Sequence, residues 1–240
     1  NALHTKWRDI AIAYAMGEKT GYTYGGICRG IVADFDALPL NESLRKPRVG
    51  IVGEILVKYM PLANNYLVDL LEQEGAEAVV PDLTDFLIEC IYQQSYKHDY
   101  LGTGWTSSLL AKVGTDGIAA VRKPAVEALK ASLRFDPPTP MAHIADLAKP
   151  FLSLGNQYGE GWFLCGEMAE LLTEGVPNIV CIQPFACLPN HVVGKGVIKA
   201  LKAAYPQANI AAVDYDPGAS EVNQLNRIKL MLSAAKKNMA

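Results

Sequence analysis

The sequence lacks the features that mark membrane, secreted and nucleic-acid-binding proteins. No apolar run reaches the roughly 18 residues that a membrane-spanning helix needs, and no signal peptide opens the chain. The 22 basic and 25 acidic residues are interleaved and leave a net charge of −3. There is therefore no basic face for nucleic acid or for a membrane surface. We expect a cytoplasmic protein that binds neither of them.

Paired cysteines are also lacking. The five cysteines are scattered through 240 residues with no CxxC spacing, so neither disulfides nor a zinc knuckle is expected. Cys90, Cys165 and Cys181 fall at predicted core positions. Cys28, in a glycine-rich stretch, and Cys187, in a loop, have the accessible contexts in which a thiol can react or bind a metal.

A strand and helix alternation is present from residue 47 onward. Short apolar runs have the length and β-branched content of buried parallel strands, and amphipathic helical patterns separate them. The strands are predicted at 48–52, 76–81, 178–183 and 209–214, and the helices at 64–75, 161–174, 192–205 and 220–237. This pattern predicts a Rossmann-like three-layer α/β sandwich with about four parallel strands in the order 2-1-3-4.

Two segments lie outside this alternation. Residues 1–46 hold a predicted helix over 6–17, followed by the glycine-rich turn GYTYGGICRG and a connector. From about 82 to 155 helical patterns replace the strand signal, which predicts a helical insertion between the second and third strands. The predicted organisation is a connector of residues 1–46 and one Rossmann-like domain of residues 47–240.

The third predicted strand ends in the loop PFACLPNH, residues 184–191. Open α/β sheets bind their ligands at the carboxyl ends of the strands. Cys187, Asn190 and His191 place a thiol, an amide and an imidazole there, which suits a metal site, a redox site or a nucleophile. A buried cysteine beside a helix-capping asparagine would explain the same residues without a ligand.

Loops after the first and fourth strands reach the same predicted edge. They carry Glu54, Lys58 and Asn64 after the first strand, and Asp214, Asp216 and Ser220 after the fourth. Such residues could bind a metal or an anion, although solvated ion pairs and turn or cap chemistry would also account for them. We expect one concavity to be lined by Glu54, Lys58, Asn64, Cys187, Asn190, His191, Asp214 and Asp216.

Three long stretches carry a resemblance to a known family. They begin VGIVGEILVKYMPLANN at residue 49, GEGWFLCGEMAELL at residue 159 and IVCIQPFACLPNHVVGKG at residue 179. Over most of residues 47–237 the chain resembles the activase-associated relatives of the 2-hydroxyacyl-CoA dehydratase iron–sulfur subunits. The resemblance implies a C-terminal domain of a longer protein, and an opening Asn-Ala in place of Met also favours an excised domain.

In that family a [4Fe–4S] cluster, held by cysteines of two Rossmann-like domains, takes one electron from an ATP-dependent activase and removes water from a 2-hydroxyacyl-CoA. The resemblance makes Cys187 the expected cluster ligand, although the family's loop reads FGCLPNH and this chain has Ala186. It implies an activase domain and an upstream cluster-binding domain as partners, and a lyase or reductase as the full-length protein. A cubane cluster needs three or four thiolates, so the isolated chain is expected to be inactive and without a cluster.

Two other functions fit the same residues. A small-molecule binding module, for an acyl-CoA or a nucleotide, would use the crevice at Glu54 and Asn190 and leave Cys187 incidental. A thiol enzyme would use Cys187 as a nucleophile activated by His191. The candidate catalytic residues are Glu54, Lys58 and His191. Neither a GxGxxG nor a GxxxxGKS motif is present to favour a nucleotide.

Overall fold

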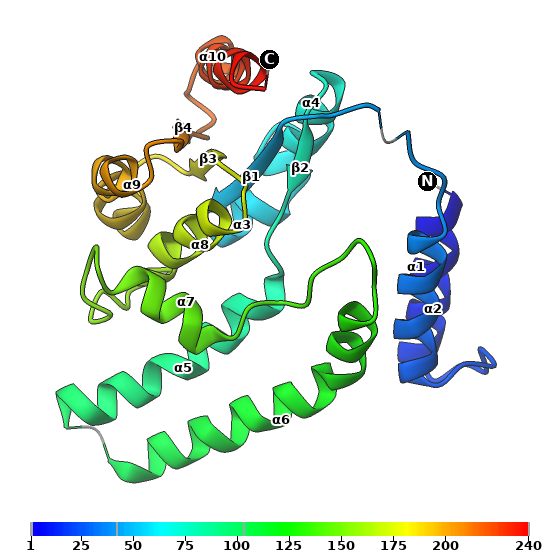
Figure 1. Cartoon of the computed structure of the whole chain (residues 1–240). Coiled ribbons are helices and arrows are strands. Elements are labelled where there is room, and N and C mark those ends of the chain that lie inside the picture. The colour runs from blue at the N-terminus through cyan, green and yellow to red at the C-terminus, as the bar shows by residue number, and fades with distance from the viewer. Residues whose placement is uncertain (1, 42, 103, 240) are drawn as a thin grey trace. The chain divides into compact units, whose positions relative to one another are not determined.

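The computed structural model describes residues 2–41, 43–102 and 104–239 (Figure 1). The chain divides into two compact units. The smaller unit comprises Asn1–Leu44 and Leu109–Thr139, and the larger comprises Arg45–Ser108 and Pro140–Ala240. All the predicted site residues except Cys28 belong to the larger unit.

A parallel sheet of four strands in the order β2-β1-β3-β4 forms the centre of the larger unit. The strands are β1 (Arg48–Gly53), β2 (Glu77–Val79), β3 (Asn178–Gln183) and β4 (Asn209–Asp214). Gly53 pairs with Ile182, and Gln183 with Asp214, so the carboxyl ends of β1, β3 and β4 lie at one edge. The predicted α/β class, strand order and parallel direction are confirmed.

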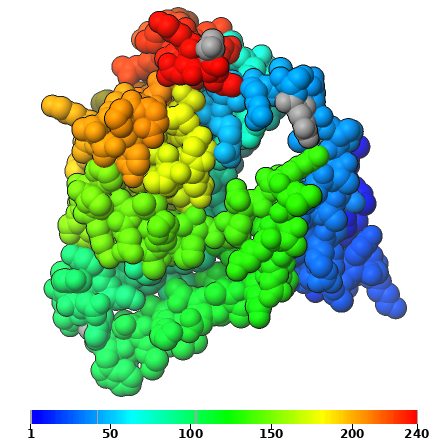
Figure 2. All heavy atoms as spheres, viewed as in Figure 1, coloured from blue at the N-terminus to red at the C-terminus, as the bar shows by residue number. Residues whose placement is uncertain are grey.

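Helices cover both faces of the sheet and make three layers (Figure 1). On one face, Leu67 and Leu71 of α4 (Leu67–Gln73) and Ile228 of α10 (Glu221–Lys237) pack on buried side chains of β1, β3 and β4. On the other, α7 (Met141–Ala148), α8 (Trp162–Thr173) and α9 (Ile198–Ala204) form the second core. In the space-filling view of Figure 2 these last segments, green to orange, are closely packed.

The predicted helical insertion between β2 and β3 is present and contains α5 (Leu83–Leu101), α6 (Trp105–Lys130), α7 and α8. Shorter helical turns follow the strands at the carboxyl edge. They are α3 (Ile55–Tyr59), the 3-10 turn η1 (Pro61–Ala63) and the π-helix η2 (Asn190–Lys195). The helices of the described residues include none long and apolar enough to span a bilayer.

The smaller unit differs from the prediction. The first helix is α1 (Ala2–Ala15), and the predicted glycine-rich turn and connector are replaced over much of their length by a second helix, α2 (Tyr24–Asp36). The Thr23 hydroxyl caps α2 by accepting a hydrogen bond from Gly26 N at 3.1 Å. A Cβ atom at Gly30 would overlap the indole ring of Trp7. That glycine therefore permits close helix packing, and does not mark a turn.

The exposure of two cysteines differs from the sequence-based prediction. Cys28, predicted to be accessible in a flexible turn, belongs to α2 and is 8% exposed. Cys90, predicted to be in the core, is exposed on α5. Cys165 and Cys181 are buried, as predicted.

Candidate functional site

The loop after β3 holds Cys187 at the carboxyl edge of the sheet. Within this loop Ala186 adopts the left-handed conformation, with φ of 63°, and Cys187 N donates to Pro184 O. The carbonyl of Cys187 then accepts a hydrogen bond from His191 N at 2.9 Å, which leads the chain into η2. The Cys187 side chain remains partly exposed.

The thiol of Cys187 faces a buried amide. Asn190 Nδ2 lies 3.2 Å from Cys187 Sγ and 3.2 Å from Glu160 Oε2, and it can donate to both. The other carboxylate oxygen of Glu160 accepts from Ile55 N at 2.9 Å. Glu160 therefore joins the loop after β1 to the loop after β3, and both amide and carboxylate are almost fully enclosed.

Glu160 was not among the predicted site residues. It stands between Gly159 and Gly161, which both have positive φ, just before the apolar helix α8. A Cβ atom at Gly161 would overlap the carbonyl of Asn156, so the turn requires glycine. The signal in the sequence was a lone acid between two glycines at the start of an apolar helix.

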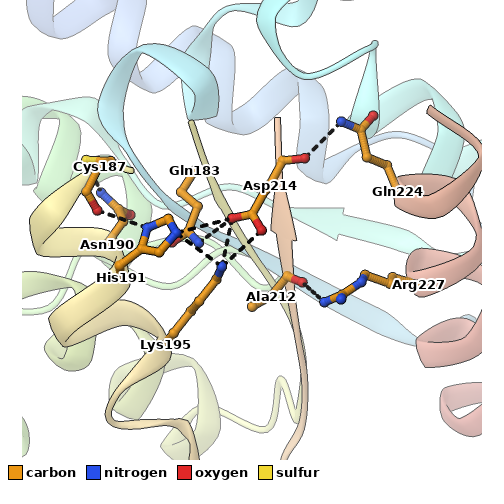
Figure 3. A network of polar contacts seen from close by, with 9 residues as sticks. All are labelled: Gln183, Cys187, Asn190, His191, Lys195, Ala212, Asp214, Gln224 and Arg227. Atoms are coloured by element: carbon orange, nitrogen blue, oxygen red, sulfur yellow. Dashed lines mark hydrogen bonds and ion pairs between the residues drawn. The ribbon is translucent and has the colours of Figure 1, made fainter. Parts of the chain in front are cut away.

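A second polar network lies beside the first and includes two of the predicted site residues, His191 and Asp214 (Figure 3). Lys195 Nζ lies 2.8 and 3.0 Å from the two carboxylate oxygens of Asp214, and 3.4 Å from His191 Nε2. Gln183 Nε2 also donates to Asp214, at 2.6 Å. The network thus links the ends of β3 and β4 with the π-helix.

The contacts of His191 select one tautomer of its neutral form. In the neutral form Nε2 accepts from Lys195, because an ammonium group can only donate, and the ring hydrogen is then on Nδ1, which lies 3.1 Å from Cys187 O. The imidazole is therefore directed at the carbonyl of Cys187. Within the described residues, the hydrogen-bond partner of the Cys187 thiol is Asn190.

Asp214 is held as an anion. Burial alone would raise the pKa of its carboxyl group, but the hydrogen bonds from Gln183 and Lys195 outweigh burial and lower that pKa below its ordinary value. The arrangement fixes a cation, Lys195, and its counter-ion at the carboxyl edge. Both side chains are about one-third exposed, at 29% and 33%.

The predicted residues after β1 have structural partners within the protein. Glu54 caps α3 by accepting from Val57 N at 2.8 Å. Lys58 Nζ is buried and pairs with Glu167 Oε1 at 2.6 Å. Asn64 is buried too, and its side chain donates to Val57 O at 2.7 Å and accepts from Leu67 N at 3.0 Å. The structure therefore brings together only part of the predicted set.

The residues after β4 are used in turn and cap positions. Asp216 accepts from Gly218 N at 3.1 Å, and Ser220 occupies the N-cap of α10 without a side-chain cap bond. Gln224 Nε2 donates to Asp214 O at 2.8 Å, and its carbonyl accepts from Asn65 at 3.0 Å. The loops after β1 and β4 are thus joined through Gln224.

A group of buried ionisable side chains lies under this edge, on the helices α5 and α8. Burial raises the pKa of Glu89 to about 8 and also raises that of Glu167, although Lys58 opposes the second shift. Gln93 Nε2 donates to both oxygens of Glu89, at 2.7 and 2.8 Å. In the sequence these acids lie among apolar residues, in DFLIEC and GEMAEL. That pattern could have indicated that they are buried.

Cys187 carries the thiol at the candidate site, and the other cysteines lie elsewhere. Burial raises the pKa of Cys165 and of Cys181 to about 12, so both stay protonated in the core. Cys90 is on α5 and Cys28 belongs to the smaller unit. Among the residues that the structure describes, no three His, Cys, Asp or Glu side chains gather in a group that could hold a metal ion.

The fold and the placement of Cys187 are the features that bear on function. A ligand site at the carboxyl edge is what a parallel, Rossmann-like sheet favours. Comparisons with known proteins found no matching family model, no similar curated protein and no similar solved structure.

Proposed function

We propose that the chain is one module of a 2-hydroxyacyl-CoA dehydratase-like iron–sulfur protein. In this proposal Cys187 gives one thiolate to a [4Fe–4S] cluster of the full-length protein, an upstream domain gives the remaining ligands, and an ATP-dependent activase delivers the electron. The observation that carries the proposal is the partly exposed Cys187 in the loop after β3, with Asn190 Nδ2 3.2 Å from its sulfur.

The Asn190 amide suits a sulfur that carries negative charge. Hydrogen bonds to ligand sulfurs are one of the means by which proteins set the potential of an iron–sulfur cluster. Asn190 is fully buried, and Glu160 accepts from the same amide nitrogen. A donor fixed in this way needs no rearrangement when a thiolate is formed.

The backbone before Cys187 also supports the resemblance on which the proposal rests. The family has glycine at the position of Ala186, and Ala186 adopts a φ of 63°, the region that glycine favours. The loop thus keeps the conformation that the glycine of the family would permit.

A complete cluster does not fit this chain alone. A [4Fe–4S] cluster needs three or four thiolates, and the described residues at this edge supply Cys187. The chain therefore supplies one ligand of a shared cluster site, and the dehydration step belongs to the assembled protein.

The proposal is tested by activase-dependent reduction of the full-length protein under anaerobic conditions. With activase and ATP, we expect an electron paramagnetic resonance signal of a reduced cluster. Cys187→Ser should abolish this signal, whereas Cys90→Ser, which removes another exposed thiol, should retain it. A signal of unchanged size in the Cys187→Ser protein would refute the proposed role of Cys187.

A further inference from the structure

The side chain of Asn190 is fully buried, and only one of its two polar atoms has a hydrogen-bond partner among the described residues. Its Nδ2 lies 3.2 Å from both Glu160 Oε2 and Cys187 Sγ, so each of its two hydrogens has an acceptor. Its Oδ1 has no such partner, although buried carbonyl groups nearly always have one. A buried oxygen of this kind is costly, so another interaction must hold the amide in this orientation.

The oxygen of the Asn190 amide lies under the π-helix η2. A Cβ atom placed on Gly194 would be 3.9 Å from Asn190 Oδ1. The same position is 3.3 Å from Cys181 Sγ and 3.7 Å from Leu164 Cδ1. These neighbours, a thiol and a methyl group, are weak partners for either end of an amide. Turning the amide over would therefore leave its nitrogen in these surroundings in place of its oxygen, with little gain.

The two orientations of the amide differ at Glu160. In the observed orientation the carboxylate accepts a charge-assisted hydrogen bond from Asn190 Nδ2. In the turned orientation Asn190 Oδ1 would face the carboxylate, and two acceptors would repel each other. Because the neighbours under η2 distinguish the two orientations only weakly, Glu160 is the group that selects between them. It thereby also selects which end of the amide faces Cys187 Sγ.

Glu160 is itself held in place by the loops at the carboxyl edge. Its Oε1 accepts from Ile55 N at 2.9 Å, and the residue is 5% exposed. It stands in the turn of Gly159 and Gly161, whose φ values of 59° and 46° favour glycine. The carboxylate therefore has a fixed position between the loop after β1 and the loop after β3, from which it can orient Asn190.

We propose that Glu160 is a positioning residue for Cys187 and acts through Asn190. Its carboxylate keeps the Nδ2 group of Asn190 directed at the sulfur, so that a thiolate or a metal-bound sulfur there meets a hydrogen-bond donor. Such a donor makes the potential of an iron–sulfur cluster less negative, because it stabilises the more negatively charged reduced state. The effect on a cluster rests on the proposed function, whereas the orientation of the amide does not.

The orientation is tested by nuclear magnetic resonance of the 15N-labelled chain. In the parent, nuclear Overhauser effects should join the side-chain amide protons of Asn190 to the β protons of Cys187. In Glu160→Gln, the new amide keeps its oxygen on the backbone N–H that follows β1 and turns its NH2 group to Asn190. Asn190 should then turn over, and its amide protons should contact Gly194 instead. Glu72→Gln, an exposed carboxyl of α4, is the control and should leave the contacts as in the parent.

Two results of this experiment would overturn the proposal. One is an unchanged set of contacts in Glu160→Gln. The other is a parent in which the amide protons of Asn190 contact Gly194 and not Cys187, a result that does not depend on whether the variant folds.

The effect on a cluster is tested by a double-mutant cycle in the full-length protein, purified without oxygen. The readout is the midpoint potential, from a redox titration followed by electron paramagnetic resonance. Glu160→Gln removes a nearby negative charge, which raises the potential in any background. Where Asn190 is present it also removes the donor from the sulfur, which lowers the potential. The shift caused by Glu160→Gln should therefore be more negative in the parent than in the Asn190→Ala protein.

The outcomes separate the role of Glu160 from that of Cys187. Equal shifts in the two backgrounds would overturn the role of Glu160 and leave Cys187 as a ligand of the cluster. A parent without a cluster would refute the proposed function, and the contacts of the Asn190 amide would then still decide whether Glu160 sets its orientation.

Discussion

Lys58 Nζ lies 2.6 Å from Glu167 Oε1, and each side chain is only 2% exposed. The pair joins α3, directly after β1, to the middle of α8, 109 residues later in the chain. It therefore fixes the loop after β1 against the helix that covers one face of the sheet. A buried ion pair is strongly destabilised when one partner is removed, because the other charge remains unpaired.

Lys58→Met should lower the free energy of unfolding by about 3 to 5 kcal/mol, because Glu167 would be left buried without its cation. Chemical denaturation at pH 7 measures the loss. The control is Lys149→Met, which breaks the exposed pair with Asp146 and should cost less than about 1 kcal/mol. Equal losses in the two variants would show that the Lys58 pair is not buried in solution.

Glu89 should make stability fall as the pH rises. Its pKa is about 8 in the folded chain, because of burial, and 4.5 for an ordinary glutamate. Between these values only the folded state keeps the proton, so the free energy of unfolding should decrease by about 2 kcal/mol or more from pH 5 to pH 8. Glu89→Gln should remove most of this decrease.

Denaturation of the parent and of Glu89→Gln across that pH range provides the measurement. Glu72→Gln, at an exposed position, is the control and should retain the decrease of the parent protein. If Glu89→Gln and the parent lose stability in parallel, Glu89 is already ionised at pH 5 in the folded protein.

Gly53 should not tolerate a side chain. It ends β1 with a φ of 152°, and an added Cβ atom would overlap the carbonyl oxygen of Ile182 on the neighbouring strand. Gly53→Ala should therefore destabilise the fold by about 3 kcal/mol or more, measured by thermal unfolding. At Gly75 the φ is 81° but no atom lies within 4 Å of the added carbon, so Gly75→Ala should cost only about 1 to 2 kcal/mol.

The sheet could be predicted because its strands are enclosed. Every residue of β3 is buried, and such a strand shows in the sequence as a short continuous apolar run. Asn64 Oδ1 likewise accepts from Leu67 N at the start of α4, and Gly75, with a φ of 81°, follows the end of that helix, so both act on residues close to them in the sequence. These features are local, and the sequence displays them directly.

Helix α2 was not predicted because glycine occurs both in turns and where two helices pack closely. Gly25, Gly26 and Gly30 have the spacing of a loop, but in the structure they belong to a helix in which Gly30 packs against Trp7. Only the partner helix shows that a small residue is required there. The same mistake made Cys28 look accessible.

The site was predicted in part. Cys187, Asn190 and His191 were found because a single loop carries them, and Asp214 because it ends the adjacent strand. Glu160 and Glu167 were not, since their partners Asn190 and Lys58 are 30 and 109 residues away. The packing of α8 on the sheet determines which distant polar residues come into contact. No local sequence pattern indicates this packing.

The iron content of the full-length protein tests the central claim most directly. Purified without oxygen, the parent should contain about four irons and four acid-labile sulfides per chain, as a [4Fe–4S] cluster requires. Cys187→Ser should lower both values sharply while the circular dichroism spectrum stays that of the parent, because the side chain is partly exposed and serine is nearly isosteric. An unchanged ratio of iron to protein in this variant would contradict the account and remove Cys187 from the ligands of the cluster.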